Sequence, residues 1–345
     1  MNTELFDLIK DDPVEGLTRA GQVIREGGTV VFPTETVYGL GANALDAQAV
    51  KKIFLAKGRP GDNPLIVHIA HQSEVTPLVE EVPEAAHQLM EAFWPGPLTM
   101  IMRRSPLIPD EVTAGLSTVA IRYPSNEYAR RLITAAGVPI AAPSANISGR
   151  PSPTKGQHVL EDMLDKVDVI LIAEDADVGL ESTVIDMTSQ PPTVLRPGGI
   201  TVDDIRGVIG EVDVSPNITH NVIPKTVRSP GMKYKHYAPH GQMVIARGTD
   251  AEKAAKIKAA MKKLGEGDKP AVLAFDETLD HYDKGLIVSM GSREDPEQMS
   301  HNLFANLRTF DDMGITHIFA EDVTLTNETL ALINRMYKAA GYTFI

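Results

Sequence analysis

Short apolar segments alternate with amphipathic helical patterns along most of this chain, and the alternation is interrupted once, at residues 214–241. Before the interruption, a helical pattern at 13–28 and an apolar strand at 29–32 begin a series that predicts a mixed α/β domain. After it, strands and helices restart and predict a small three-layer α/β domain with a parallel-type sheet. The interruption itself shows no periodicity and is rich in Pro, Asn and His. Segments of that kind and length are usually functional lids or linkers.

The size of the chain agrees with this division. At 345 residues the chain is longer than a single core usually becomes, so we expect two domains, 1–213 and 242–345, joined by the linker 214–241. The 43% hydrophobic and 23% charged content is typical of soluble globular proteins. We expect no membrane segment, because no apolar run approaches the roughly 20 residues that a spanning helix needs. The absence of cysteine excludes disulfides, thiolate metal sites and a cysteine nucleophile, and it fits a cytoplasmic location.

The charge of the chain limits its partners. The formal net charge of −13 argues against general binding to nucleic acid through phosphate neutralisation. The cations are unevenly spread: residues 1–215 carry 17 Lys+Arg against 30 Asp+Glu, whereas 216–240 carry four cations and no acid. A simple spacer between two acidic domains needs no concentration of positive charge, so the charge of this segment suggests a function beyond connecting the domains.

Three polar blocks stand out in the first domain. They are PTETVYGLGANAL at 33–45, KGRPGDNPLIVH at 57–68 and SANISGRPSPT at 144–154. Each combines small hydroxyls, glycines and single cations, which suit a site where backbone must approach a polyanion closely. The structural alternative is that each block is only a well-capped turn.

Four cations are candidates for such a site. Lys57 and Arg59 end a helical pattern before Pro60, so they either complement the helix dipole or form a cationic hook on a phosphate. Arg122 and Arg196 each end an apolar strand and precede a Pro turn. Either they project from one sheet edge into a common crevice, where α/β folds bind ligands, or they are surface arginines with local partners.

The serine, asparagine and histidine candidates also have two interpretations each. Ser144, Asn146 and Ser152 suit a triphosphate tail, or they make local turns. Ser182 could hold a carboxylate or ribose, or cap a turn. His68, centred in the strand pattern PLIVHIA, is either a satisfied core residue or a ligand contact. No cluster has metal-ligand spacing, so any metal would arrive with a nucleotide.

The familiar nucleotide signatures are missing from the chain. It contains no GxxxxGK[ST] motif. GLGANA at 39–44 matches GxGxxA, which leaves a dinucleotide-dependent oxidoreductase as an alternative, although about six residues separate the preceding strand from Gly39.

Taken in order, PTETVYGLGANA, KGRP…NPL, SANISGRPS, ESTVID and VLRPGGI resemble the threonylcarbamoyl-AMP synthases of the YrdC-domain family. The likeness runs through roughly residues 12–212, and SPGMKYKHYAP with the C-terminal domain resembles the two-domain branch. The resemblance implies a YrdC-like twisted mixed sheet with helices, followed by a smaller Rossmann-like three-layer α/β domain.

The resemblance also implies a nucleotidyltransferase reaction. L-threonine, bicarbonate and ATP, with Mg²⁺ carried by ATP, would give threonylcarbamoyl-AMP and pyrophosphate. A downstream transferase would use the product to modify tRNA. The implied threonine contacts are Thr36, His68, Arg122, Ala142 and Ser182. The implied ATP contacts are Arg59, Asn63, Thr118, Ser144, Ser152, Arg196 and Tyr234, with Lys57 and Arg59 as the catalytic cations.

On this interpretation the basic linker becomes a lid. Lys233, Tyr234, Lys235 and His236 would fold over the nucleotide and exclude water from a mixed anhydride that hydrolyses readily. An RNA-binding module remains an alternative from a different class, and the acidic charge disfavours it.

Overall fold

The computed structural model describes residues 2–218 and 237–345 and divides into two compact units. The first consists of Met1–Ser148 and Ser152–Tyr234, and the second of Gly149–Pro151 and Lys235–Ile345. Both are α/β, as the sequence predicts. The four residues assigned to the tip of the lid, 233–236, lie outside the described residues, so the structure gives no view of that prediction.

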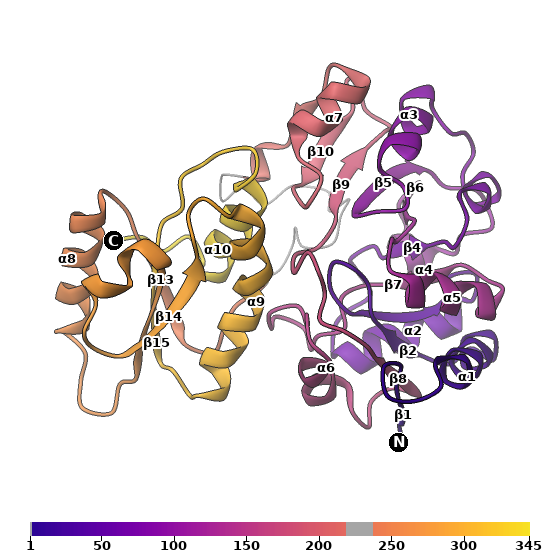
Figure 1. Cartoon of the computed structure of the whole chain (residues 1–345). Coiled ribbons are helices and arrows are strands. Elements are labelled where there is room, and N and C mark those ends of the chain that lie inside the picture. Colours follow the sequence, from indigo (N-terminus) through magenta and orange to yellow (C-terminus); the bar gives the residue numbers. More distant parts are fainter. Residues whose placement is uncertain (1, 219–236) are drawn as a thin grey trace. The chain divides into compact units, whose positions relative to one another are not determined.

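A large twisted mixed sheet organises the first unit (Figure 1). It contains parallel pairs, such as β4 (Ile66–His68) with β6 (Thr118–Arg122), and antiparallel pairs, such as β5 (Leu98–Arg103) with β6. Across the sheet the order is β1 (Glu4–Asp7), β8 (Val169–Ile172), β2 (Val30–Phe32), β3 (Gly39–Asn43), β7 (Ile140–Ala142), β4 (Ile66–His68), β6 (Thr118–Arg122), β5 (Leu98–Arg103), β9 (Thr183–Asp186), β10 (Thr193–Arg196) and β11 (Asp213–Val214).

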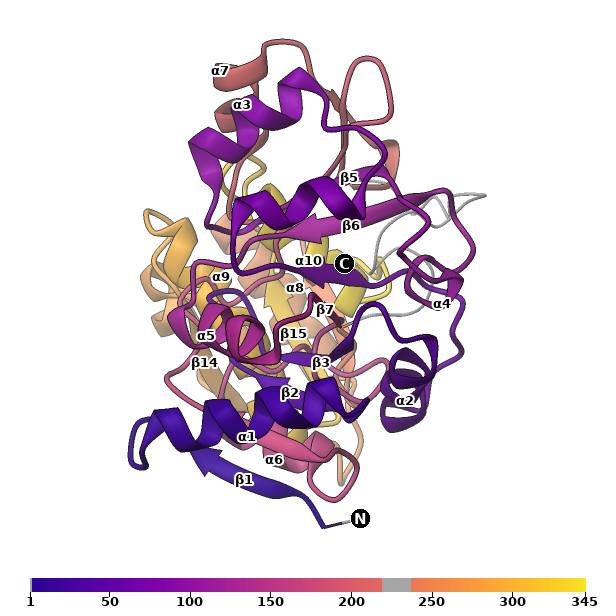
Figure 2. The ribbon, with the colours of Figure 1, turned by 90° about the vertical axis from the view of Figure 1, so that its right-hand side faces the viewer.

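Helices of the first unit pack in pairs and against the sheet (Figure 2): α1 (Pro13–Arg25) on α5 (Glu127–Ala136), α3 (Glu84–Phe93) on α7 (Val202–Ile209), and α2 (Ala47–Lys57) on α4 (Asp110–Thr113). Leu17, Ala20 and Ile24 of α1 are buried in a core with strands β2 and β8, which the apolar spacing of this helix predicts. The helices are α1 (Pro13–Arg25), α2 (Ala47–Lys57), α3 (Glu84–Phe93), α4 (Asp110–Thr113), α5 (Glu127–Ala136), α6 (Gly156–Met163) and α7 (Val202–Ile209), with 3₁₀ turns at Gln72–Leu78 and Pro216–Ile218.

The glycines of GLGANA have a different role from the one expected. Gly39 and Gly41 lie inside β3, which runs antiparallel to β2, so the segment is a strand and not a turn that cradles a polyanion. A Cβ on Gly41 would lie 2.5 Å from Cγ2 of Ile140 and 2.8 Å from Cε1 of Phe32. Close packing therefore requires glycine here. Because the dinucleotide fingerprint needs a strand that turns directly into a helix at these glycines, the oxidoreductase alternative is wrong.

The second unit has the three layers that the sequence predicts. Its sheet is parallel throughout, in the order β12 (Gln242–Ala246), β15 (His317–Glu321), β13 (Pro270–Phe275) and β14 (Leu286–Gly291). Helix α8 (Asp250–Met261) lies on one face, and α9 (Pro296–Asp312) and α10 (Leu330–Ala339) on the other (Figure 1). A 3₁₀ turn at Asp276–His281 follows β13. Apolar strand residues such as Val272 and Phe319 form the core beneath α8.

Within the ranges 2–218 and 237–345, none of the helices combines the length and apolar character needed to cross a bilayer.

Candidate functional site in the first unit

Strands β4, β6, β5, β9 and β10 bring polar residues from distant parts of the sequence into one row. His68 is in register with Arg122, and Arg122 with Thr99. Thr99 is in register with Val184, which pairs with Arg196 after a shift of register between Val194 and Arg196. The hydroxyl of Ser182 contacts both Thr99 and Arg196, which places the two side chains on the same face. Residues opposite each other in register project from the same face of a sheet. Two arginines and a histidine predicted as ligand contacts thus share one face, and we call His68, Arg122, Thr99 and Arg196 the polar row.

Arg122 is the best-defined cation of the row. Only 4% of the residue is exposed, and its Nη2 lies 2.7 Å from Oε1 of Glu35 as a buried ion pair. Burial is the largest single influence on Glu35 and would raise its pKa, but the charge of Arg122, its hydrogen bond and backbone hydrogen bonds together outweigh burial and hold that pKa below its usual value. Within the described residues Nε of Arg122 has no hydrogen-bond partner. A buried guanidinium with a remaining donor is suited to a carboxylate.

The threonines of PTETV complete the surroundings of Arg122. Nη1 of Arg122 donates to Oγ1 of Thr36 at 2.8 Å, and the two hydroxyls of Thr34 and Thr36 are 2.9 Å apart. Since Thr34 donates its proton to the carbonyl of Val37 at 2.6 Å, Thr36 is the donor between the two hydroxyls. Thr36 is fully buried, so its geometry is fixed by this chain of hydrogen bonds.

His68 is a buried neutral imidazole. Burial, together with the nearby charge of Arg122, lowers the pKa of His68 to about 3. Its Nδ1 lies 3.1 Å from the carbonyl of Ile66 and donates to it, which leaves Nε2 as an acceptor.

Arg196 and Ser182 form the other end of the row. Nε of Arg196 donates to the carbonyl of Ser182 at 3.0 Å, and Nη2 donates to its Oγ at 3.1 Å. The same Oγ lies 2.7 Å from Oγ1 of Thr99. The arginine therefore fixes the hydroxyl of Ser182 beside Thr99 of β5, where the sequence suggested only a turn cap or a ligand contact.

The loop SANIS is held by Lys57. Helix α2 ends at Lys57, and Gly58, with φ +61°, turns the chain away. The Lys57 ammonium is buried and donates to the carbonyls of Ser144 and Asn146, while Oγ of Ser144 donates to the Asn146 amide oxygen. The two hydrogen bonds from Lys57 hold the loop against the end of helix α2, and we call this arrangement the Lys57 clamp. Neither the helix-dipole nor the phosphate-hook interpretation of Lys57 predicted this role.

Backbone hydrogen bonds join this loop to the other polar segments. Tyr38 donates to the carbonyl of Pro153 at 2.9 Å and accepts from Ala145 at 2.8 Å, and Val178 donates to Glu35 at 2.8 Å. Oγ of Ser152 donates to Oε1 of Glu181 at 2.5 Å. Ala142 ends β7 just before the loop, in register with Ile66.

Three further predicted residues lie toward the opposite ends of β4 and β6. Asn63 precedes β4 and Thr118 begins β6, about 13 Å from Arg122 at the usual rise per residue of a strand. Asn63 is fully buried, yet neither polar atom of its amide has a partner within the described part of the chain. Arg59 is half-buried over the ring of Phe54, 5.5 Å from its centroid.

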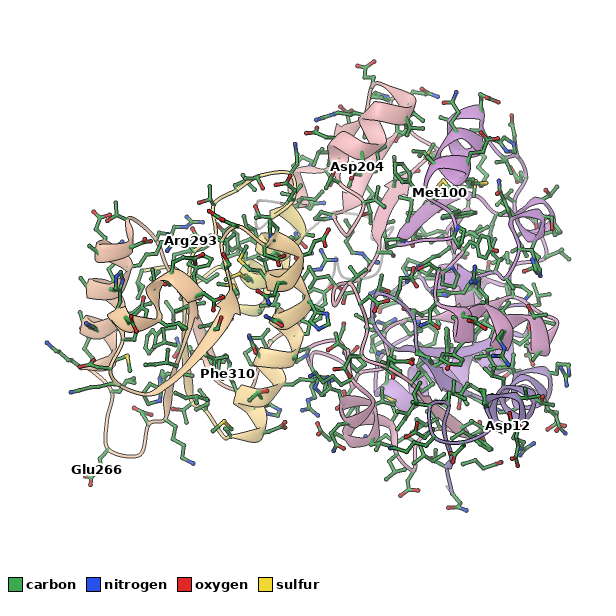
Figure 3. All side chains as sticks on the ribbon, in the orientation of Figure 1. Asp12, Met100, Asp204, Glu266, Arg293 and Phe310 are labelled. Atoms are coloured by element: carbon green, nitrogen blue, oxygen red, sulfur yellow. The ribbon has the colours of Figure 1, made fainter. Side chains whose placement is uncertain are left out.

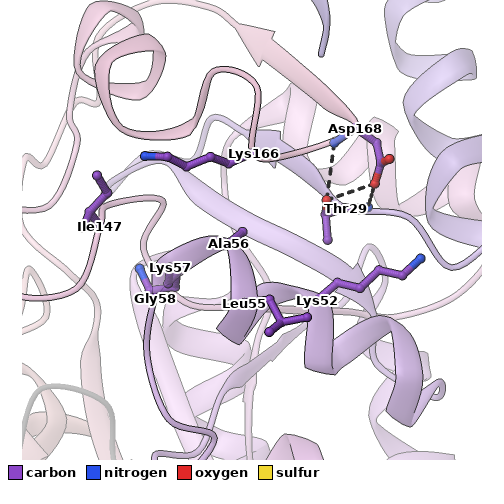
Figure 4. Close-up of a pocket in the computed structure, with 9 residues that line it drawn as sticks. All are labelled: Thr29, Lys52, Leu55, Ala56, Lys57, Gly58, Ile147, Lys166 and Asp168. Carbon is purple, nitrogen blue, oxygen red and sulfur yellow. Dashed lines mark hydrogen bonds between the residues drawn. The ribbon is translucent and has the colours of Figure 1, made fainter. Parts of the chain in front are cut away.

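A cavity of about 550 Å³ lies beside the Lys57 clamp, and Figure 4 shows Lys52, Lys57 and Lys166 around it. Asp168 on its wall accepts from the backbone and hydroxyl of Thr29, at 2.7 and 3.0 Å. None of the polar row lines this cavity.

The sequence did not single out Glu35, Thr99 or Glu181. Glu35 lies inside the quoted PTETV block, and Glu181 is the first residue of ESTVID. The signal available in the sequence was an acidic residue, Glu35, between two threonines in a block already predicted to belong to the site. Thr99 carries no local signal, since only the pairing of β5 with β6 and β9 brings it into the row.

The fold and site define a class: a two-unit α/β protein whose mixed sheet carries a buried row of cations, hydroxyls and a neutral histidine. A family model described as "Telomere recombination" matches residues 22–198, and one described as "Threonylcarbamoyl-AMP synthase, C-terminal domain" matches residues 200–341. The chain is 46% identical over 327 residues to the threonylcarbamoyl-AMP synthase of Pyrococcus abyssi, covering 94% of each. It is 44% identical to that of Bacillus subtilis, covering 97% of this chain and 95% of the relative.

Solved structures give the same result. The crystal structure of the Pyrococcus abyssi protein Sua5 complexed with L-threonine matches with a TM-score of 0.91 at 43% identity, over 100% of this chain and 98% of that one. The chain belongs to the threonylcarbamoyl-AMP synthase family, in its two-domain form.

Proposed function

We propose that the protein makes threonylcarbamoyl-AMP and pyrophosphate from L-threonine, bicarbonate and ATP. The single observation that carries the proposal is the polar row, in which Arg122, His68 and Arg196 share one face of the sheet. Family membership and the threonine complex of the relative support the substrate class.

The threonine end of the site is assigned to Arg122, with Thr36, His68, Ala142 and Ser182 around it. The Nε donor of Arg122 would bind the substrate carboxylate, and the ion pair with Glu35 keeps the guanidinium in place. Nε2 of neutral His68 would accept from the substrate hydroxyl or amine. A site that hydrogen-bonds the hydroxyl would reject amino acids lacking it, because its own buried groups would be left unpaired.

The ATP end is assigned to residues that carry amide, hydroxyl or guanidinium groups: Arg59, Asn63, Thr118, Ser144, Ser152, Arg196 and Tyr234. Asn63 supports this part, because a buried amide without a partner in the described residues is costly unless a ligand satisfies it. The separation of about 13 Å between Thr118 and Arg122 suits a site that must hold two substrates end to end. Catalytic roles for Lys57 and Arg59 stay predictions, and the contacts of Lys57 favour positioning of the SANIS loop.

Mg²⁺ is proposed to enter with ATP. No three carboxylate or histidine groups gather into a metal cluster among residues 2–218 and 237–345, and Glu35 and Glu181 are engaged by Arg122 and Ser152. The triphosphate and water would therefore hold the ion, which would neutralise phosphate charge.

The chemistry proceeds in two steps. Bicarbonate takes up a proton and gives carbon dioxide and water, and the amine of threonine then adds to the carbon dioxide and loses a proton to give a carbamate. A carbamate oxygen then attacks the α-phosphorus, a new P–O bond forms, and the bond to the β-phosphate oxygen breaks with release of pyrophosphate. Arg122 would orient the amino acid and Arg196 would stabilise phosphate charge; orientation of this kind is worth about 7–11 kcal/mol.

The product is proposed to pass to a tRNA-modifying transferase in the cytoplasm. Because the chain is acidic, we expect that it does not itself bind nucleic acid stably.

Pyrophosphate release from ATP, measured with each substrate omitted in turn, tests the proposal. Omission of threonine or of bicarbonate should abolish release. Arg122→Ala should mainly raise the KM for threonine, and Arg196→Ala or Arg59→Ala the KM for ATP. Arg206→Ala, on the exposed surface of α7, is the matched control and should behave like the unmodified protein. Release that continues without threonine would refute the proposed reaction.

A further inference from the structure

The second unit has a cavity of its own, separate from the residues assigned above. Its volume is about 300 Å³, and every residue that lines it belongs to the second unit. The cavity lies at the carboxyl end of the parallel sheet. Gly248 follows β12, Phe275 ends β13, Arg293 follows β14 and Asp322 follows β15. Open parallel α/β sheets bind ligands outside the carboxyl ends of their strands.

Two cations, Lys253 and Arg293, line this cavity together with three carboxylates, of which Asp250 is paired with Arg293 and Asp322 with Arg247. The side chain of Lys253 is only 10% exposed, and its Nζ donates to the carbonyl of Asp322 at 3.1 Å. Arg293, labelled in Figure 3, donates through both terminal nitrogens to Asp250, at 2.7 and 2.9 Å. Both stand over the ring of Phe275, at 4.4 Å for Arg293 and 5.2 Å for Lys253. Nε of Arg293 is buried and has no hydrogen-bond partner within 2–218 and 237–345.

The backbone adds to the positive character of this wall. Helices α8 and α9 begin at the cavity with Asp250 and Pro296, and Thr329 precedes α10 there. The amino-terminal ends of helices attract anions, and here they occur together with Lys253 and Arg293.

The loop after β15 adds hydrogen-bond acceptors and hydroxyls to the lining of the cavity. Glu328 and Thr326 are exposed side chains on the loop after β15, and Thr324 lies beside them. The hydroxyl of Thr329 is already used, since it donates to the carbonyl of Thr324 at 2.6 Å. A ligand with hydroxyl groups would find acceptors on this loop and cations at Lys253 and Arg293.

We propose that this cavity binds a small phosphate ester that carries free hydroxyl groups, such as a pentose phosphate or a nucleoside monophosphate. The phosphate lies against Lys253, Arg293 and the helix ends, and the hydroxyls donate to Glu328. A volume of about 300 Å³ is at the small end of ligand pockets and suits a ligand of this size better than a dinucleotide.

Chemical-shift mapping on the ¹⁵N-labelled full chain tests the proposal, with ribose 5-phosphate, AMP and inorganic phosphate as probes. Ribose 5-phosphate should shift the amides of Gly248, Lys253 and Thr326 saturably, with a Kd of about 1 mM or less. Inorganic phosphate should bind at least about tenfold more weakly, a loss of roughly 1.4 kcal/mol. AMP, which also resembles the substrate of the first unit, should shift these amides in addition to any near Thr36. No saturable shift at the three amides, or equal affinity for inorganic phosphate and the ester, would overturn the proposal.

Three variants and a control distinguish the proposed phosphate contacts, Lys253 and Arg293, from the proposed hydroxyl contact, Glu328. Arg293→Lys keeps the positive charge but removes the planar guanidinium with its Nε donor. It should therefore weaken binding of both ribose 5-phosphate and inorganic phosphate. Glu328→Gln, on an exposed side chain, should weaken only the ester. Lys253→Gln should weaken all probes, and Lys258→Gln, exposed on the same helix, should change none. Unchanged thermal unfolding would show that each variant is folded, and unchanged affinity in folded Arg293→Lys and Lys253→Gln would refute the assignment.

Discussion

His68 and Arg122 lie directly opposite each other on the parallel strands β4 and β6, and each residue is only 4% exposed. The guanidinium is charged and paired with Glu35, whereas the imidazole is neutral because burial and the neighbouring charge both oppose its protonation. The site thus holds a permanent cation beside a permanent acceptor. That combination suits an amino acid, whose carboxylate and hydroxyl need the two kinds of partner.

The neutral imidazole predicts a pH dependence of stability. The folded-state pKa of His68 is about 3 and the unfolded value about 6.5, so the unfolded chain binds more protons between these limits. Stability is therefore fully present above pH 6.5 and is lost as the pH falls toward 3, by up to about 1.4 kcal/mol per pH unit. At pH 5 the loss should be about 2 kcal/mol relative to pH 7.

Urea unfolding measures this loss, with fluorescence of Trp94 as the probe because this residue is the one tryptophan of the chain and lies in the first unit. His68→Asn should remove the difference between pH 7 and pH 5 that is due to this group. Equal pH dependence in the variant and the unmodified protein would show that folding does not lower the pKa of His68.

The ion pair between Arg122 and Glu35 predicts that stability and threonine use can be separated. Arg122→Ala leaves a buried carboxylate without its partner and should lower the free energy of unfolding by about 3–5 kcal/mol. Arg122→Met combined with Glu35→Gln should recover most of that loss, since no buried charge remains. Pyrophosphate release should stay defective in both, with a raised KM for threonine.

The exposed pair of Arg19 and Glu4 serves as the control, and Arg19→Ala should cost no more than about 1 kcal/mol. If the double variant used threonine normally, Arg122 would have only a structural role.

The sequence predicted the position of several site residues but not their partners. Arg122 and Arg196 end strands as expected, because apolar runs followed by Pro turns are local patterns. Their sharing of a row depends on the strand order β6-β5-β9-β10, which no local pattern specifies. The same limit applies to Lys57, whose carbonyl partners are more than 80 residues away in the sequence.

The glycines of GLGANA show how a local signal can mislead. Glycine permits backbone conformations that other residues avoid, and it also lets a neighbouring side chain pack closely against an ordinary strand. The sequence does not show which of these two reasons applies. In β3 the second reason applies, since Ile140 and Phe32 occupy the space beside Gly41.

Close packing around Gly41 predicts a large effect from a single methyl group. Gly41→Ala would place a Cβ 2.5 Å from Cγ2 of Ile140, so the strands must shift, and the free energy of unfolding should fall by about 1–3 kcal/mol. Gly207→Ala in α7 is the matched control, because nothing lies within 4 Å of its Cβ. It should stabilise by up to about 1 kcal/mol, as alanine is the better helix former. Similar unfolding free energies for the two variants would contradict this account of β3.

The buried amide of Asn63 predicts that a stabilising change can impair the enzyme. Replacement by leucine, a side chain of similar size, removes two buried polar atoms that have no partner among the described residues. The free energy of unfolding should therefore stay constant or rise, by about 1–3 kcal/mol at most. The same change should raise the KM for ATP, because the proposed nucleotide contact is lost, and should leave the KM for threonine unchanged. Urea unfolding and pyrophosphate release measure the two effects on one sample. A variant that is destabilised yet uses ATP normally would show that Asn63 is satisfied within the protein and does not contact the nucleotide.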